Sequence, residues 1–251
     1  MIVLTAGDAT ARVDPQAGGR LASLVVGGAE RLVTGSMQDD PMVWGCYPMA
    51  PWAGRLRRGQ LNFEGRTYRL PSDAEPHAIH GTVYRRAWVV DEEGSMATGL
   101  GADWPFAGHA RQRITLEPGR LRCRLELHAD TPMPATIGYH PWFAAPVELD
   151  VAPTHQYRRD ADGLPDGTFV APDPRPWDDC FTGLAAPPTL TFGDGLVVTV
   201  TADVDHWVLY TPDHAVCVEP QTGPPDGPHL EPHVVEPGAP LVLSMDLSWP
   251  A

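Results

Sequence analysis

The sequence predicts an all-β protein built as a large sandwich. Its 25 glycines and 28 prolines are spread so evenly that few windows could hold three turns of helix without one of them inside. More than a dozen short runs of alternating or continuous apolar residues separate these turn residues. So many short strands within 251 residues are typical of a large sandwich of antiparallel sheets.

The first third of the chain contains two predicted strand pairs and an irregular segment. Residues 11–26 predict two short strands around a double-glycine turn, and residues 61–70 predict a hairpin with Glu64-Gly65 at its tip. Residues 44–58 are too rich in proline to be regular and too apolar to be a solvated linker. We expect a packed loop there that presents the cation Arg55.

The remaining two thirds of the chain contain one predicted loop and further predicted strands. Residues 160–176 form a predicted loop rich in Pro, Gly and Asp, which is followed by the cluster Trp177-Asp178-Asp179-Cys180-Phe181. The alternation of basic and apolar residues in 120–128 predicts a sheet with one solvated face. The further predicted strands are residues 85–93, 110–116, 196–201, 206–211, 215–218 and 241–248.

Charge and hydropathy exclude several classes of function. The net charge of −14 repels polyanions, and no basic block could neutralise a run of phosphates, so nucleic acid is not an expected partner. No segment is long enough to cross a membrane as a helix, and the N-terminus lacks the basic flank and apolar core of a signal peptide. We therefore expect a cytoplasmic protein with no membrane partner.

The cysteine spacing and the absence of repeats predict the redox state and the domain organisation. The four cysteines are scattered without a C-x-x-C pair, which predicts reduced, buried thiols rather than a zinc knuckle or redox motif. No internal repeat, low-complexity tract or linker interrupts the chain. We expect one domain spanning residues 1–251, acting as a monomer or a homodimer.

Titratable residues recur in aromatic or proline-rich settings at predicted strand ends. His80, His140 and Glu219 are of this kind, and Arg55 and Asp178 add a cation and an acid. An imidazole and a carboxylate facing each other across a cleft can serve as acid and base on one substrate, so His140 and Glu219 are candidates for catalysis. Each residue also has a structural interpretation: a packed histidine, a solvated arginine, a turn or cap aspartate, or a strand-end charge.

Aromatic rings near these groups favour a sugar as the ligand. Trp52, Trp142 and Trp177 offer flat faces for the C–H faces of a sugar, while charged groups take its hydroxyls. The spacings His77-x-x-His80 and His229-x-x-x-His233 lack a third ligand in any familiar metal pattern, so no metal is expected. No Gly-x-Ser-x-Gly elbow and no Gly-rich phosphate loop is present.

Taken in order, five motifs resemble the aldose 1-epimerases, or galactose mutarotase-like proteins. They are Gly18-Gly19-Arg20-Leu21-Ala22-Ser23-Leu24, Pro51-Trp52-Ala53-Gly54-Arg55-Leu56-Arg57-Arg58-Gly59, Ile79-His80-Gly81, Gly138-Tyr139-His140-Pro141-Trp142-Phe143 and Cys217-Val218-Glu219-Pro220. The resemblance covers most of the chain and implies a β-supersandwich of large antiparallel sheets. It implies no cofactor and a small monosaccharide as the partner.

The resemblance also implies roles for single residues. Glu219 would take the proton of the anomeric hydroxyl and His140 would protonate the ring oxygen, with Trp142 and Phe143 as the wall beside it. His80 would assist near the ring oxygen. Arg55 and Asp178 would hold ring hydroxyls, although Asp179 could take the place of Asp178. The chain departs from the best-known galactose mutarotases at Gly54, where they have Asn, and at Thr82, where they have a second glycine.

Three other functions fit parts of the sequence. Residues 80–86 resemble a segment of the hexose-phosphate mutarotases, whose arginines bind phosphate. The same fold could host a non-catalytic carbohydrate-binding protein. Glu219 and Asp178 could instead be the two carboxylates of a glycoside hydrolase, which stand roughly 5 to 9.5 Å apart in such enzymes.

Overall fold

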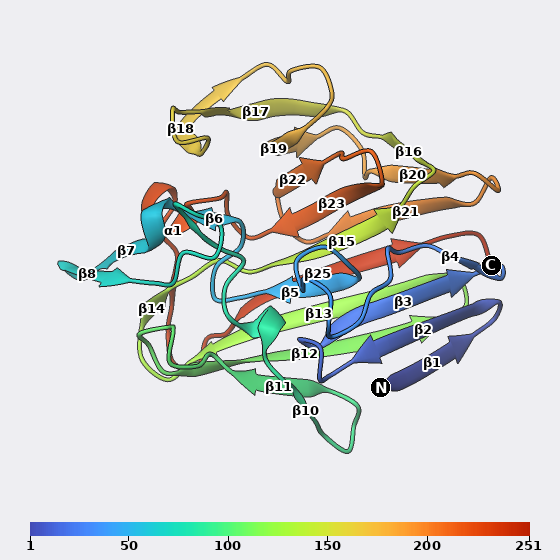
Figure 1. Ribbon diagram of the computed structural model, residues 1–251, viewed down its shortest axis with the longest axis horizontal. Helices are drawn as coiled ribbons and strands as arrows, with labels where there is room; N and C mark the ends of the chain where they lie inside the picture. Colours follow the sequence, from blue (N-terminus) through green and yellow to red (C-terminus); the bar gives the residue numbers. More distant parts are fainter.

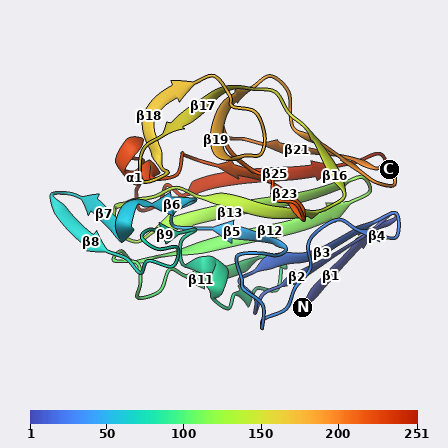
Figure 2. The same ribbon diagram turned by 45° about the horizontal axis from the view of Figure 1, so that its top comes forward.

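The computed structural model describes residues 1–251 and consists of two large antiparallel sheets, one stacked on the other (Figures 1 and 2). The larger sheet has 11 strands, one of which, β4, pairs with β3 at its side. From one edge of the sheet to the other, the strands are β1 (Ile2–Ala6), β2 (Ala9–Asp14), β3 (Arg20–Val26, beside β4, Ala29–Glu30), β5 (Cys46–Met49), β15 (Gly138–Ala144), β23 (Ala215–Gln221), β22 (His206–Tyr210), β19 (Asp178–Leu184), β17 (Pro153–Arg159) and β18 (Pro165–Val170).

The second sheet has eight strands and is antiparallel throughout. In order they are β10 (Val89–Val90), β11 (Met96–Gly99), β12 (Gly108–Glu117), β13 (Arg120–Ala129), β25 (Leu241–Ser248), β21 (Val197–Ala202), β20 (Thr189–Phe192) and β16 (Val147–Asp150). The predicted all-β supersandwich is therefore confirmed.

Three short strand pairs and three single helical turns decorate the sheets. The pairs are β6 (Arg55–Leu56) with β9 (Ala78–Ile79), β7 (Gln60–Phe63) with β8 (Arg66–Arg69), and β14 (Met133–Pro134) with β24 (Val234–Val235). The helical turns are η1 (Arg57–Gly59), η2 (Val83–Arg85) and α1 (Gly227–Leu230). No helix is long and apolar enough to cross a membrane.

The main core is a cluster of 47 buried residues contributed by both large sheets. Alternation along the strands builds it: in β13, Leu121, Cys123 and Leu125 are fully buried, whereas the intervening arginines lie on the solvated face. Arg122 pairs there with Asp246 of β25, with Nε 2.8 Å from Oδ1. The predicted sheet with one solvated face is confirmed.

Some boundaries differ from expectation. The hairpin of residues 61–70 is confirmed as β7 and β8, but only Val89–Val90 of the predicted strand 85–93 pairs as a strand. The predicted loop 160–176 contains β18, an edge strand held by β17, and the cluster at 177–181 opens β19. These strands depend on partners distant in sequence, which local composition does not reveal.

Candidate active site

The candidate site lies on β15 and β23, which are neighbours at the middle of the larger sheet. Side chains alternate between the two faces of each strand. Tyr139 and Phe143 of β15 and Val218 of β23 belong to the main core, whereas Trp142 and Cys217 pack in a separate cluster. His140 and Glu219 share the face of Trp142 and Cys217, away from the main core.

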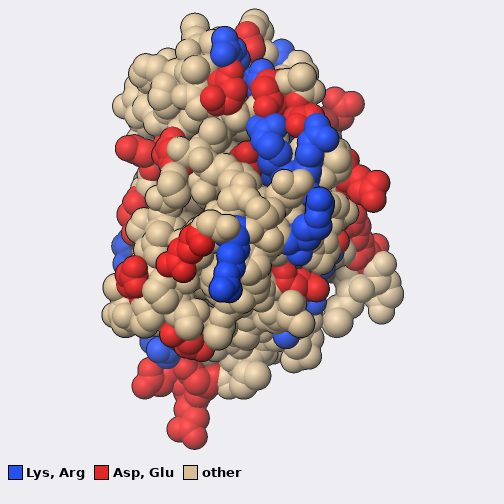
Figure 3. All heavy atoms as spheres, turned by 90° about the vertical axis from the view of Figure 1, so that its left-hand side faces the viewer, with Lys and Arg blue, Asp and Glu red and all other residues tan.

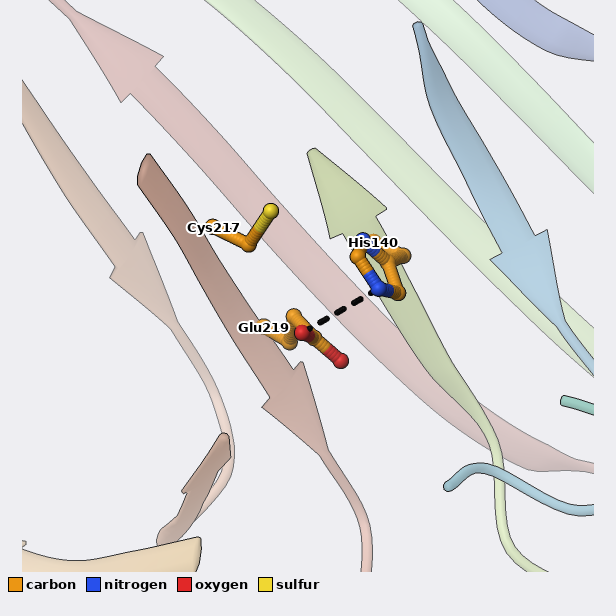
Figure 4. A group of neighbouring side chains, drawn as sticks. All are labelled: His140, Cys217 and Glu219. Atoms are coloured by element: carbon orange, nitrogen blue, oxygen red, sulfur yellow. Dashed lines mark ion pairs between the residues drawn. The ribbon is translucent and has the colours of Figure 1, made fainter. Parts of the chain in front are cut away.

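Strand register places the candidate acid and base directly opposite each other. Gly138 pairs with Gln221 and Trp142 with Cys217, so His140 and Glu219 stand at facing positions between these two pairs. The His140 Nε2 atom lies 3.2 Å from the Glu219 Oε1 atom (Figure 4). Only 6% of the His140 side chain and 2% of the Glu219 side chain is exposed. We call these two residues the dyad.

Aromatic rings fix the imidazole of His140 in place. Its ring is stacked between Tyr47 and Trp142, with centroids 4.8 and 5.2 Å away. The His80 ring meets His140 edge-on at 5.1 Å. The Nδ1 atoms of both histidines are buried without a hydrogen-bond partner, which is a costly state.

His80 reaches the dyad from a tightly constrained loop. Its backbone has a φ of 59°, and its N–H donates to the Gly54 carbonyl at 2.9 Å. A Cβ on Gly81 would lie 2.0 Å from the Ala50 carbonyl oxygen, so only glycine fits after His80. Gly54 has a φ of 67°, a backbone region that glycine and asparagine tolerate best. A Cβ at Gly54 would also lie 2.9 Å from Pro225 Cγ, so glycine fits this position without a shift of Pro225.

All six predicted site residues line one cavity. Its volume of about 310 Å³ lies at the lower end of the range for ligand pockets, which suits a small molecule. Arg55, His80, His140, Trp142, Asp178 and Glu219 all contribute to its lining. The deeply buried dyad marks its inner end, whereas Arg55 and Asp178, with 40% and 41% of their side chains exposed, mark its mouth.

Two arginines and two aspartates balance each other at the mouth. The Arg55 Nη1 atom lies 3.6 Å from Asp178 Oδ2, and Arg159 Nε lies 2.8 Å from Asp179 Oδ1. Arg159 Nη2 also approaches Asp178, at 3.8 Å. Asp179 is 14% exposed and closely paired, so Asp178 is the more available of the two acids. Arginines are interspersed with acids in the same way over the molecular face shown in Figure 3.

Asp226 secures the loop that carries Arg55. Its backbone N–H donates to the Arg55 carbonyl at 2.7 Å. Its carboxylate, 2% exposed, accepts hydrogen bonds from the backbone N–H and the Nε of Arg57 at 3.0 and 3.1 Å. Arg57 also pairs with Asp160 and Asp162, which links this loop to the segment after β17.

Burial sets the proton affinities of the site. It raises the pKa of the Glu219 carboxyl well above 4.5, with a further rise from Asp178 and a partial offset from Arg55. It lowers the pKa of His140 from 6.5 to about 3 and that of His80 well below 6.5. Both histidines are thus neutral near neutral pH, and the acid is biased toward keeping its proton.

Several expectations for neighbouring residues were wrong. Phe143 lies on the opposite face of β15, in the main core, and is no wall of the cavity. Trp52 and Trp177 also pack in that core, so Trp142 is the one of the three tryptophans that lines the cavity. The strand period of two decides the placement of Phe143, because it separates adjacent residues onto opposite faces.

In each of the two histidine pairs noted in the sequence, one member is held by contacts with a neighbouring segment. His77 accepts a hydrogen bond from the Arg58 N–H at Nδ1 and lies 3.2 Å from the Asp162 carbonyl at Nε2, so it is occupied in fixing a loop. His229 Nδ1 lies 2.8 Å from Asp226 Oδ1.

Sequence reasoning missed several residues of the cavity, among them Tyr47, Arg159, Tyr210 and Gln221. Tyr47 was within the predicted packed loop, and Gln221 lies two residues beyond Glu219, on the same face of the strand. The position of Gln221 could therefore have been inferred. Arg159 and Tyr210 end strands whose neighbours are set by long-range pairing, and no local pattern marks them.

Comparison with known proteins identifies the family of the chain. The family model for aldose 1-epimerase matches residues 1–192, so the chain belongs to this family. A search of curated proteins finds no match.

Solved structures resemble the chain over nearly all its length. A putative aldose 1-epimerase from Escherichia coli K12 aligns with a TM-score of 0.83 at 19% identity, covering 99% of this chain and 98% of that one. A GalM/aldose epimerase homologue from C. elegans gives a TM-score of 0.83 at 16% identity, with 99% and 98% covered. Galactose 1-epimerase from Lactobacillus acidophilus NCFM gives 0.81 at 17% identity, with 97% and 91% covered. At these identities the likeness shows the fold.

Proposed function

We propose that the protein is an aldose 1-epimerase that interconverts the α and β anomers of a free aldose. One observation carries the proposal: an imidazole and a carboxylate 3.2 Å apart at the inner end of a cavity of sugar size. The two oxygens that exchange protons in this reaction, O1 and the ring oxygen O5, are bonded to the same carbon. Two proton carriers that serve such neighbouring atoms must themselves be neighbours, as His140 and Glu219 are.

The dyad holds one transferable proton, and in its reacting form that proton has passed from Glu219 to His140 across the 3.2 Å between them, which leaves an ionised carboxylate and an imidazolium. One proton of the sugar then moves to Glu219, and the imidazolium gives one proton to the sugar. The ionised Glu219 carboxylate takes the proton of the O1 hydroxyl while the C1–O5 bond breaks and its electron pair goes to O5. O5 takes a proton from His140 Nε2, which gives the open-chain aldehyde. After rotation about C1–C2, O5 attacks the other face of C1, and both protons return along the same paths.

The remaining residues of the cavity position the sugar. His80 stands edge-on to His140 and offers an unpartnered Nδ1. Trp142 supplies a ring at the cavity wall, and Arg55 with Asp178 supplies a donor and an acceptor for ring hydroxyls at the mouth. A neutral polyol matches such a balanced set of donors and acceptors.

The charges favour a free sugar over a sugar phosphate. Both arginines of the cavity lie close to aspartates, Arg55 to Asp178 and Arg159 to Asp179. Arg85, from the segment that resembles the hexose-phosphate mutarotases, pairs instead with Asp73 at 2.9 Å. A phosphate would have to displace an aspartate to gain an arginine.

Polarimetry on freshly dissolved α-glucose and α-galactose tests the proposal. We expect the optical rotation to reach equilibrium faster with enzyme than in buffer, and Glu219→Gln to remove most of the acceleration. Saturable sugar binding without acceleration across a broad panel of aldoses would favour a non-catalytic binding protein.

A further inference from the structure

Cys217, a residue of a type that binds metal ions, lies beside the dyad. The His140 Nε2 or Nδ1, Cys217 Sγ and Glu219 carboxylate atoms lie within 4.8 Å of one another, and all three residues are buried (Figure 4). Cys217 is two residues before Glu219 on β23, so strand alternation puts both side chains on one face. Cys217 is a free thiol.

The spacing fits a tetrahedral metal ion. Zn²⁺ binds sulfur at roughly 2.3 Å and nitrogen or oxygen at roughly 2.0 to 2.2 Å, which puts neighbouring ligand atoms roughly 3.2 to 3.7 Å apart. The His140–Glu219 distance of 3.2 Å already falls in that range. The Cys217 Sγ atom lies within 4.8 Å of the other two ligand atoms, so it would have to move toward them on binding to complete the set.

The chemistry of the donors selects the kind of metal. Thiolate and imidazole favour Zn²⁺, Cd²⁺ and Co²⁺, whereas Mg²⁺ and Ca²⁺ require mostly oxygen ligands. Three protein ligands would leave a fourth position, and His140 and Glu219 line the cavity into which it would open.

We propose that the inner end of the cavity is an inhibitory site for thiophilic divalent cations, held by His140, Cys217 and Glu219. The cation takes the lone pairs with which the dyad accepts and returns protons, so it excludes turnover while bound. It also occupies the position of O1 and O5, so it competes with the sugar. The inhibitory effect rests on the proposed epimerase function, whereas binding of the cation does not.

Cys217→Ala isolates the thiol from the proton carriers. We expect this variant to keep its basal epimerase rate within about twofold, because no step of the proposed reaction uses the thiol. Half-inhibition by ZnCl₂ should need at least about tenfold more metal than in the wild type. Loss of a residue that only hydrogen-bonds a metal ligand already lowers metal affinity about 10- to 100-fold, and Cys217 is proposed as a ligand itself. Cys123→Ala removes another free, buried thiol, on β13 of the second sheet, and should be inhibited like the wild type.

Co²⁺ supplies a readout that does not depend on turnover. Addition of CoCl₂ to the wild type and to Cys123→Ala should produce the intense near-ultraviolet absorption of a thiolate–Co²⁺ bond, and Cys217→Ala should lack it. Added aldose should raise the ZnCl₂ concentration needed for half-inhibition, whereas MgCl₂ should have no effect on the rate.

Three results would overturn the proposal. They are equal ZnCl₂ sensitivity of wild type and Cys217→Ala, activation by Zn²⁺, and a thiolate–Co²⁺ band that persists in Cys217→Ala. A protein without epimerase activity that still shows the Cys217-dependent band would contradict the proposed function and leave the metal site standing. Thermal melting of each variant confirms that the comparison is made between folded proteins.

Discussion

His140 and Glu219 occupy facing positions on adjacent antiparallel strands, and the His140 Nε2 atom lies 3.2 Å from the Glu219 Oε1 atom. Their separation is therefore set by the register of the central sheet rather than by a loop. Side chains at facing positions on neighbouring strands are held at short and reproducible distances. A rigid sheet thus supplies the preorganisation that acid–base catalysis needs.

Glu219→Gln should lower the rate and raise the stability. Loss of the base costs typically 10²–10⁴-fold in rate. The unfolded chain ionises Glu219 above about pH 4.5, whereas burial holds its proton to higher pH in the folded state. The native protein is therefore penalised progressively as the pH rises from 4.5 through the folded pKa, and glutamine escapes that penalty.

Thermal melting across pH checks the stability half of this prediction. The melting temperature of Glu219→Gln should exceed that of the wild type at neutral pH, and the difference should shrink at or below about pH 4.5, the ordinary pKa of glutamate. A difference of the same size at all pH values would show that the raised pKa is not its cause.

His140→Asn should abolish most turnover with a modest loss of stability. Removal of the proton donor costs about 10²–10⁴-fold. The folded pKa of His140 is lowered from 6.5 to about 3, so its contribution to stability is present above pH 6.5 and is lost as the pH falls from 6.5 toward 3. As the pH falls across that interval, the free energy of unfolding of His140→Asn should therefore decrease less than that of the wild type. The substitution also changes stability by an amount that does not depend on pH. Equal proportional losses of melting temperature and activity would instead indicate a structural histidine.

The pH dependence of kcat/KM should be bell-shaped. The dyad works while it holds one transferable proton, so activity falls when a second proton binds and when the last proton leaves. Burial lowers the pKa of His140 and raises that of Glu219, so the acid limb should lie well below pH 6.5 and the alkaline limb well above pH 4.5. An acid limb centred at the ordinary histidine pKa would contradict the assigned burial of His140.

Asp178→Asn should raise KM more than Asp179→Asn does. Asp178 is 41% exposed at the mouth beside Arg55, whereas Asp179 is tied to Arg159 at 2.8 Å. Loss of one hydrogen bond to a hydroxyl costs about 0.5–1.5 kcal/mol, or roughly a 2- to 12-fold rise in KM. Steady-state kinetics on one aldose decide the matter, and the reverse order would assign the sugar contact to Asp179.

Asp226→Asn should raise KM through its effect on Arg55. The substitution weakens the bonds to Arg57 and loosens the loop whose Arg55 carbonyl Asp226 fixes. Asp162→Asn is a matched control, because Asp162 pairs with the same Arg57 side chain at 3.1 Å but makes no hydrogen bond to Arg55. We expect a larger rise in KM for Asp226→Asn, with kcat changed less than KM. Equal kinetic effects in both variants would show that Asp226 stabilises the loop in general and does not position Arg55.

Local sequence predicted much of the fold and of the dyad. The alternation in β13 and the turn Glu64-Gly65 are local features, and both elements formed as expected. His140 and Glu219 carry recognisable chemistry in recognisable motifs, and both line the cavity as anticipated. β18 was missed because an edge strand of exposed residues is defined by its partner β17 rather than by its own composition.

The faces of the tryptophans could not be read from composition. Trp52 and Trp142 each stand within three residues of a candidate polar residue, yet Trp52 stacks on Trp104 in the core at 5.5 Å and Trp142 stacks on His140. Only strand register and layer packing decide which ring meets the cavity. Cys217 was judged an ordinary buried thiol for the same reason, because its proximity to His140 follows from the pairing of β15 with β23.

Anomer-exchange NMR on an equilibrated aldose tests the central claim most directly, because it reports interconversion without a coupled reagent. With wild-type enzyme, saturation of the α anomeric proton of glucose or galactose should transfer to the β signal far faster than in buffer. Glu219→Gln and His140→Asn should each reduce the enzyme-dependent exchange to about 1% of the wild-type rate or less. Exchange in either variant that matches the wild type would contradict the claim that the dyad carries the protons.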